Sequence, residues 1–180
     1  MRVFIGWDSR EHEAYVACAN SIYINNKAKD VDIFPIKQSN LEGRGLYQRK
    51  FFYPLEQAST EFAFTRFLTP RLADHEGWAI FCDCDFIWTR DIQELWDMRD
   101  DRYAVMVVKH DYIPRNSVKM DGQPQIAYPR KNWSSMMMFN CEHPSCHKLT
   151  PRTVSEQTGA WLHRFEWCSD SEIGEVRLRS

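Results

Sequence analysis

The chain has 180 residues, which is long enough for one domain with a buried core. Its 23 Lys and Arg residues nearly balance its 25 Asp and Glu residues, so charge gives no bulk attraction to nucleic acid or to an anionic membrane. No apolar run approaches the roughly 18–20 residues of a membrane span, and the N-terminus becomes charged after Gly6, unlike a signal peptide. We therefore expect a single cytoplasmic domain, residues 1–180, whose six cysteines are thiols.

The first half of the chain alternates apolar runs with segments of helical periodicity. In chain order we predict a strand at 1–6, a helix at 10–26, a strand at 31–36, a loop at 37–54 and a helix at 59–72. Asp8 and Ser9 precede the first helix and suit its N-cap. Pro35 lacks a backbone N–H, which favours an edge position for the second strand.

The second half continues the same alternation. We predict a strand at 77–88, a helix at 91–98, a strand at 103–108, a long polar loop at 112–133, a strand at 134–140 and a helix at 150–165. Asp91 suits the N-cap of the first of these helices, and Thr150 followed by Pro151 suits that of the second. Strands that alternate with helices predict an α/β fold with a mostly parallel central sheet flanked by helices.

Polar residues follow three of the predicted strands. They are Gly6-Trp7-Asp8, Asp83-Cys84-Asp85 and Lys109-His110-Asp111. Ligands of parallel α/β sheets bind beyond the carboxyl ends of the strands, so the sequence predicts that these groups meet at one edge.

Asp83 and Asp85 are the most informative pair. On a regular strand, side chains two residues apart share a face, and two carboxylates on one face repel unless a cation lies beside them. Mg²⁺ and Mn²⁺ prefer oxygen ligands and often also bind substrate phosphates. The pattern therefore favours a divalent metal site; the alternative is a strand end where one Asp caps a turn and the other is solvated.

Cationic and aromatic residues could complete a phosphate or nucleotide site. Arg66 could bind a diphosphate bidentately, or lay its stem over the core. Lys109 has the same two interpretations, and Trp7 could stack on a nucleobase or merely pack. The cluster Cys141, His143, Cys146 and His147 lacks a second ligand pair at zinc-finger spacing, so we interpret it as a polar loop.

Several of these segments together resemble one family. They are FIGWDSREHEAY, STEFAFTRFLTPRL, GWAIFCDCDFIW, VVKHDY and AYPRKNWSSMMMFN. In combination they are similar to the family 8-like glycosyltransferases of the GT-A fold, over nearly the whole chain. The resemblance implies a Rossmann-like nucleotide-diphospho-sugar transferase that uses a divalent metal, Mn²⁺ or Mg²⁺, and retains anomeric configuration.

The resemblance also implies roles for individual residues. Gly6, Trp7 and Asp8 match the segment that holds the nucleoside, whereas Arg66 matches a donor-contacting arginine with a part in catalysis. Asp83 and Asp85 match the Asp-x-Asp motif that binds metal and donor, and Lys109 would add a donor contact. The acceptor pocket is matched by Asn132, Ser134, Ser135 and Asn140. The acidic segment near the transferred sugar is matched by Asp170, a catalytic candidate, and by Glu172.

One departure concerns the third metal ligand. Family members supply a late histidine followed by lysine and tryptophan, and none of the six histidines here lies in such a motif. His110 at a strand end is one substitute. We expect a C-terminally shortened domain in which the two aspartates form part of the metal site.

Two other functions stay open from the residues alone. Haloacid dehalogenase-like phosphatases also place Asp-x-Asp after an apolar strand, with the first Asp as nucleophile, but they have Thr or Val two residues later, where this chain has Ile87. A non-catalytic domain could also keep a nucleotide-sugar pocket without turnover. The sequence names neither the sugar nor the acceptor, which could be a sugar, a lipid or a protein.

Overall fold

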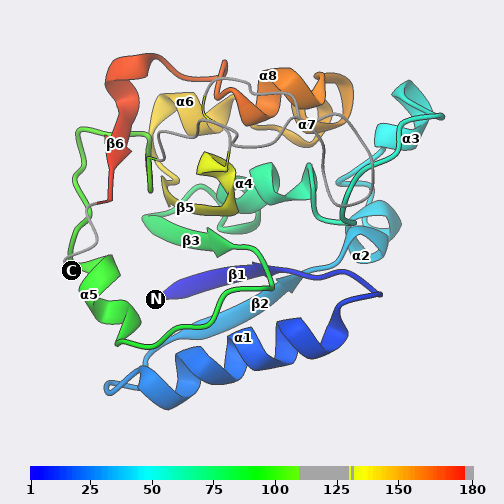
Figure 1. Ribbon diagram of the computed structural model, residues 1–180. Helices are drawn as coiled ribbons and strands as arrows, with labels where there is room; N and C mark the ends of the chain where they lie inside the picture. The colour runs from blue at the N-terminus through cyan, green and yellow to red at the C-terminus, as the bar shows by residue number, and fades with distance from the viewer. Residues whose placement is uncertain (110–129, 131, 177–180) are drawn as a thin grey trace, which may run out of the picture.

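A six-stranded sheet forms the centre of the protein (Figure 1). The computed structural model describes residues 1–109, 130 and 132–176. The strands, in the order in which they lie across the sheet, are β2 (Asp32–Ile36), β1 (Arg2–Gly6), β3 (Trp78–Cys82), β5 (Met136–Asn140), β4 (Val105–Val107) and β6 (Ile173–Glu175). As the proline predicts, β2 lies at an edge of the sheet.

The sheet is mostly parallel, as expected, with one reversed strand. β1 pairs in parallel with β2 and β3, and β4 pairs in parallel with β6. β5 is antiparallel to both of its neighbours, β3 and β4. The first residue of β5 therefore lies beside the last residue of β3, at the carboxyl edge of the other strands.

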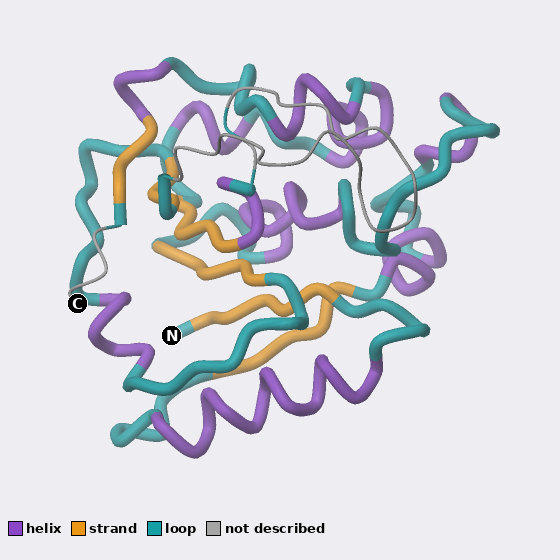
Figure 2. The backbone as a smooth tube through the Cα atoms, in the orientation of Figure 1, coloured by secondary structure: helices purple, strands orange, loops and turns teal. Residues whose placement is uncertain are grey.

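Helices cover both faces of the sheet (Figure 2). The helices are α1 (His12–Asn25), α2 (Gln38–Gly43), α3 (Arg49–Phe52), η1 (Thr65–Leu68), α4 (Thr69–Leu72), α5 (Ile92–Trp96), η2 (Trp133–Ser135), α6 (Pro144–His147), α7 (Pro151–Glu156), α8 (Gly159–His163) and η3 (Asp170–Glu172). In Figure 1, α1 lies below the sheet, and α4, α6, α7 and α8 lie above it. The fold is thus the layered α/β architecture that the alternation of elements predicts.

Some element predictions are wrong in detail. The segment 37–54 is not simply a loop, because it contains α2 and α3. The segment 59–72 is not one helix: it consists of turns, η1 and α4. The predicted helix at 150–165 divides into α7 and α8, and α1 has no side-chain cap, since Asp8 has other partners. Phe62, Phe64 and Phe67 are all buried although no single helical face presents them, so packing has overridden local propensity.

Other local predictions are confirmed. The side chain of Asp91 accepts a hydrogen bond from Gln93 N and caps α5, and that of Thr150 accepts one from Thr153 N and caps α7. In both cases an oxygen on a short side chain accepts a hydrogen bond from a helix N–H that has no partner within the helix.

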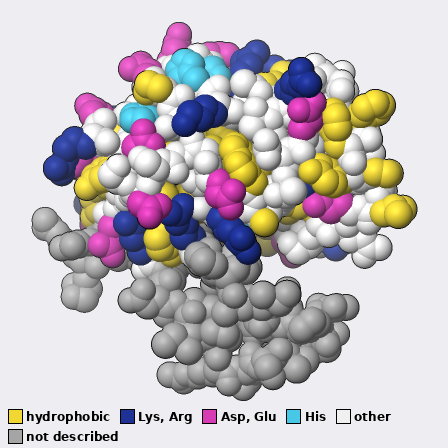
Figure 3. Space-filling model, turned by 90° about the horizontal axis from the view of Figure 1, so that it is seen from above, with side chains coloured by type: hydrophobic (Ala, Val, Ile, Leu, Met, Phe, Trp, Pro, Cys, Tyr) yellow, Lys and Arg dark blue, Asp and Glu magenta, His cyan; other side chains and the backbone are white. Residues whose placement is uncertain are grey.

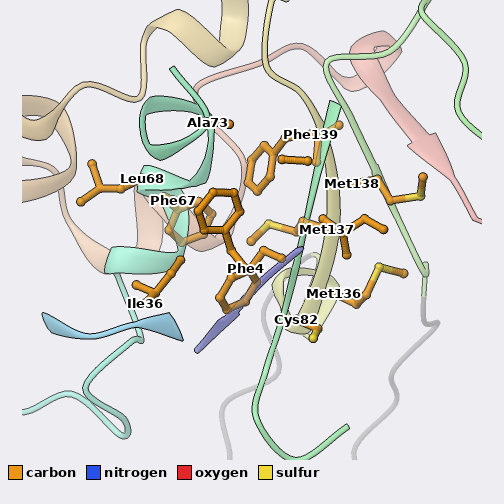
Figure 4. Close-up of a cluster of buried hydrophobic side chains, with 14 of the residues drawn as sticks. Phe4, Ile36, Phe67, Leu68, Ala73, Cys82, Met136, Met137, Met138 and Phe139 are labelled. Carbon is orange, nitrogen blue, oxygen red and sulfur yellow. The ribbon is translucent and has the colours of Figure 1, made fainter. Parts of the chain in front are cut away.

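The central strands are buried on both faces. Every residue of β3 and of β5 is buried, as expected for strands that lie between two layers of helices. Alternate side chains of β5 point to opposite sides, so that Phe139 points toward Phe67 while Met136 and Met138 point away from it (Figure 4). This packing fixes β3 and β5, and with them the residues at the carboxyl edge.

The surface carries charges of both signs. On the face seen from above, Lys and Arg side chains lie interspersed with Asp and Glu side chains (Figure 3). Among the described residues, no helix combines the length and the apolar character needed to cross a membrane.

Candidate functional site at the carboxyl edge of the sheet

The Asp-x-Asp pair lies in a turn and not on a strand. β3 ends at Cys82, and Asp83 and Asp85 follow it. The backbone N–H of Asp83 donates to the carbonyl oxygen of Ser135 at 2.9 Å, which ties the turn to η2. The expectation that both carboxylates share a strand face is therefore wrong, because the ladder stops one residue before the first of them. Asp85 is exposed, whereas the side chain of Asp83 is 22% exposed.

Arg66 connects the elements around this turn. Its Nη1 lies 2.7 Å from Oδ1 of Asp83 and donates to the carbonyl oxygen of Ser134 at 2.8 Å. Its Nε lies 3.1 Å from the carbonyl oxygen of Ala63, one turn back along its own segment. The guanidinium lies 5.1 Å from the centre of the Phe81 ring, and the side chain is only 7% exposed. Arg66 therefore holds η1, η2 and the Asp83 turn together from inside the protein.

The environment of Asp83 perturbs the pKa of its carboxyl group. Burial raises its pKa from 3.8 to about 6; the nearby charge of Arg66 opposes this rise, and Asp85 and Glu11 add to it. Oδ1 of Asp83 is buried and accepts no well-aligned hydrogen bond among the described residues, although it lies next to Arg66. Glu11 lies close by, since its Oε2 accepts from the thiol of Cys84 at 3.2 Å. The turn thus gathers negative charge that one arginine balances only in part.

These carboxylates fit part of a divalent metal site. Carboxylate oxygens are the ligands that Mg²⁺ and Mn²⁺ prefer, and the buried Oδ1 of Asp83 has unused acceptor capacity. Within residues 1–109, 130 and 132–176, no three His, Cys, Asp or Glu side chains are grouped so that they could hold a metal ion. Asp83 and Asp85 could therefore supply two of the ligands, and the others must come from elsewhere.

The residues after β1 are close to this turn but are partly committed to structure. The carboxylate of Asp8 is fully buried, and its two oxygens accept four hydrogen bonds, from Arg10 N, Nε and Nη2 and from Glu61 N. The bonds from the Arg10 side chain hold the pKa of Asp8 well below its usual range. Asp8 therefore joins the β1–α1 loop to residue 61 and exposes no oxygen to a ligand.

Gly6 and Trp7 directly precede Asp8 in the sequence. A Cβ at Gly6 would lie 2.4 Å from the ring of Phe62, so a glycine is required for this close packing. The Nε1 of Trp7 donates to Nδ1 of His12 at 3.3 Å, and the ammonium of Lys37 lies 4.4 Å from the centre of its ring. Trp7 is only partly buried, so some of its surface is available to a ligand.

The predicted acceptor residues separate into two groups. Asn132, Ser134 and Ser135 lie in or next to η2, beside Asp83. Asn140 pairs with Trp78, the first residue of β3, and so lies at the opposite edge of the sheet. The reason is that β5 runs antiparallel to β3, which carries its last residue away from the site. The prediction that Asn140 lines a pocket with the three others is wrong.

Asp170 and Glu172 are also distant from the Asp83 turn along the sheet. They lie in η3, before β6, and β6 pairs in parallel with β4, so they come at the starting edge of the strands. The carboxylate of Asp170 is 89% exposed and forms an ion pair with Arg130. Glu172 accepts from Ser169 N, and this bond lowers its pKa. The backbone of η3 thus lies at the starting edge, but Asp170 pairs with Arg130, whose guanidinium lies 5.8 Å from the centre of the Trp133 ring in η2.

Lys109 follows β4 and lies at the carboxyl edge, as predicted. Its ammonium donates to the carbonyl oxygen of Ile173 at 3.1 Å and lies 5.4 Å from the centre of the Trp133 ring. His110, Asp111 and residues 112–129 and 131 of the predicted loop lie outside the described residues.

The Cys-His cluster is not the polar loop that the sequence predicts, because it contains the helix α6 and two buried cysteines. Cys141 and Cys146 are fully buried, and burial raises the pKa of each thiol, to about 12 for Cys141. Burial therefore keeps both thiols protonated in the folded protein.

Two neighbours of the site were not predicted from the sequence. Glu11 lies near Asp83 because α1 begins beside the end of β3. The Nδ1 of His163 on α8 lies 2.8 Å from Oγ of Ser134, behind η2. Neither residue belongs to a local motif, so only the fold could reveal them.

Solved structures with this arrangement of elements are sugar transferases. The chain superimposes on WbbM, a bifunctional glycosyltransferase, with a TM-score of 0.62 at 19% identity, over 98% of this chain and 38% of that one. An active-site mutant of LgtC gives a TM-score of 0.61 at 9% identity, over 98% of this chain and 72% of that one. These identities establish the fold, which is that of the GT-A glycosyltransferases.

The family follows from the sequence. Residues 10–159 match the family described as glycosyl transferase family 8, and this chain belongs to that family. It is 52% identical over 175 residues to "Protein CDI" of Arabidopsis thaliana, which covers 97% of this chain. The chain spans 66% of the length of that relative. Family membership confirms the resemblance seen in the motifs and removes the phosphatase alternative.

Proposed function

We propose that this chain is the donor-binding part of a metal-dependent glycosyltransferase. It would move a glycosyl group from a UDP- or GDP-sugar to an acceptor with retention of anomeric configuration. Its family membership supports a transferase. The observation that carries the proposal is Asp83, a mostly buried carboxylate at the carboxyl edge of the sheet, where ligands of such folds bind; its Oδ1 keeps acceptor capacity beyond its ion pair with Arg66.

The transfer exchanges one C–O bond for another. The bond between the anomeric carbon and the diphosphate oxygen breaks, and its electron pair leaves with the diphosphate. The acceptor oxygen forms the new bond to the anomeric carbon, and its proton passes to the released diphosphate. The barrier falls when the negative charge that develops on the diphosphate is stabilised.

Asp83 and Asp85 would hold the divalent cation, Mn²⁺ or Mg²⁺. A bound ion of this kind neutralises charge on the leaving diphosphate. Arg66 fixes the carboxylate of Asp83 through their 2.7 Å contact, and Lys109 lies at the same edge as a second positive charge. We assign Asp170 no step in this proposal; its carboxylate is paired with Arg130.

The nucleoside would lie over the end of β1. Gly6 lets the chain pack tightly on Phe62, and the partly exposed Trp7 offers an aromatic surface for a base. Asp8 contributes by fixing the loop that carries Trp7, since its oxygens are occupied by Arg10 and Glu61.

We test the proposal by following the melting temperature with UDP, GDP and Mn²⁺, alone and in combination. A ligand that binds only the folded state stabilises it by about 2.7 kcal/mol at a concentration of 100 times its Kd. We expect a rise with nucleotide and Mn²⁺ together that exceeds the sum of the separate effects.

The double variant Asp83→Asn with Asp85→Asn should lose the part of the rise that depends on Mn²⁺. A matched control, Asp32→Asn with Asp74→Asn, removes two exposed aspartates elsewhere and should keep it. If the first double variant keeps a full Mn²⁺-dependent rise, the proposed metal site is wrong.

A non-catalytic nucleotide-sugar-binding domain is the second candidate. It shares the melting response, and it is favoured by the missing third metal ligand among the described residues. Release of free sugar or transfer product from a UDP- or GDP-sugar separates the two: turnover supports the transferase, and binding without turnover supports the binding domain.

We also propose a cytoplasmic location. Its support is that all six cysteines are unpaired and buried, as is usual for proteins in a reducing compartment. Fractionation of cells that express the tagged chain would test it, and recovery from a secretory compartment would contradict it.

A further inference from the structure

A mostly apolar cavity of about 370 Å³ lies between the segment after Asp85 and the sheet. This volume lies within the range of small-molecule sites, roughly 300–1,000 Å³. Its apolar lining includes Phe86, Ile87, Trp88, Leu95, Val108 and Met136. The residues come from three separate parts of the fold: the segment after β3, the helix α5 with its flanking residues, and the carboxyl edge of the sheet, where Val108 follows β4 and Met136 begins β5.

The cavity begins at the candidate site. Phe86 is the residue after Asp85. Met136 pairs with Cys82, the residue before Asp83. Two of the lining residues are therefore immediate backbone neighbours of the Asp-x-Asp turn.

The charged side chains that line the cavity already have partners. Arg90 and Glu94 form an ion pair at 3.1 Å. Asp91 accepts from Gln93 N, from Asn26 Nδ2 and from Lys27 N. The surface left for a ligand is consequently mostly apolar, and a ligand gains most there by removing apolar area from water.

The mouth of the cavity carries an unusual residue. Ile87 is 61% exposed although it is a large aliphatic side chain. Next to it, the rings of Phe86 and Trp88 lie 6.4 Å apart, tilted by 35°. This combination of an exposed aliphatic residue and adjacent aromatic rings offers a contact surface for a ring or a chain.

We propose that this cavity holds the apolar body of the acceptor, so that the acceptor is a hydroxyl compound carried on an aryl or alkyl group. The inference rests on the proposed transferase function and names the substrate class of the same site. The apolar group fills the cavity, and the hydroxyl group is directed toward the Asp83–Asp85 turn. The acceptor oxygen and its proton follow the balance given above for the transfer.

The test uses 2-phenylethanol, which carries a hydroxyl group on an apolar body, and ethylene glycol as a polar comparison. Binding to the chain with UDP and Mn²⁺ present is measured by ligand-observed NMR. We expect saturable binding of 2-phenylethanol, at least tenfold tighter than that of ethylene glycol, which corresponds to about 1.4 kcal/mol.

Two matched variants locate the binding. Ile87→Asp places a charge at the cavity mouth and should weaken the binding of 2-phenylethanol at least tenfold. Ile24→Asp alters a residue on α1 that is 77% exposed and does not line the cavity, and it should change nothing. Both residues are exposed, so both variants should fold; the UDP and Mn²⁺ melting response checks this.

The outcomes are distinct. Absence of saturable binding, or binding that Ile87→Asp leaves unchanged, overturns the cavity proposal, and an intact nucleotide response in the same sample leaves the transferase proposal standing. With the sugar nucleotide that stabilises the chain most, a 2-phenylethyl glycoside should form, and Ile87→Asp should reduce its yield. If the glycoside does not form although the donor is turned over, the cavity does not serve the acceptor.

Discussion

His163 should make the stability of this protein depend on pH in the mildly acidic range. Its ring packs edge-on against Phe64 and Phe67, with centroids 6.0 and 5.2 Å away, and Nδ1 lies 2.8 Å from Oγ of Ser134. Burial, and then the charge of Arg66, lower its pKa from 6.5 to about 3. The folded protein therefore holds this histidine neutral.

The sign and the size of the expected change in the free energy of unfolding follow from proton linkage. Between pH 6.5 and 3 the unfolded chain binds a proton that the folded chain does not, so stability falls as the pH falls through that range. At about 1.4 kcal/mol per pKa unit, the limiting loss at very low pH is about 5 kcal/mol. Between pH 7 and pH 5 the loss from this group is about 2 kcal/mol, and it is an upper limit because His163 is only partly buried.

The assay is urea denaturation at pH 7 and pH 5, followed by tryptophan fluorescence. The variant His163→Gln keeps a hydrogen-bonding side chain but cannot titrate. On acidification from pH 7 to pH 5, its free energy of unfolding should therefore fall by less than that of the parent, with a difference of up to about 2 kcal/mol. His12→Gln changes an exposed histidine on α1 and should behave like the parent. Equal pH dependence in the parent and in His163→Gln would refute the reasoning.

The remaining predictions concern packing and capping, and each is measured by urea denaturation at pH 7. Gly6→Ala should destabilise by about 1–3 kcal/mol, because its Cβ would lie 2.4 Å from the ring of Phe62; Phe62→Leu should recover part of this loss, and an unchanged midpoint for Gly6→Ala would contradict the packing. Arg66→Met should destabilise by about 3–5 kcal/mol, because it leaves the nearly buried Asp83 without its positive charge. Adding Asp83→Asn should restore part of that, whereas simple additivity would show that the two residues are not coupled. Asp91→Ala should destabilise by about 1 kcal/mol through loss of the α5 cap, and a change within error would show that the cap contributes little.

The amino-acid sequence by itself determined the alternation of elements, the α/β class and the family. The apolar runs at β1, β3 and β5 are predicted because buried strands need continuous apolar residues. The caps Asp91 and Thr150 are predicted because capping is a local interaction within a few residues. The Asp-x-Asp turn is found because a carboxylate after an apolar strand is conspicuous in the sequence alone.

The tertiary structure decided which of these residues meet. Asn140 lies at the far edge because β5 runs antiparallel to its neighbours, and strand direction depends on long-range pairing that no local pattern encodes. Arg66 is buried against Asp83 and against Ser134, which lies 68 residues further along the chain. The phenylalanine-rich segment before α4 forms turns in place of a long helix because its rings are buried without regard to helical spacing. Local propensity amounts to less than about 1 kcal/mol per residue, whereas burial of one aromatic side chain contributes about 1.5–3 kcal/mol; where the two conflict in this chain, burial prevails.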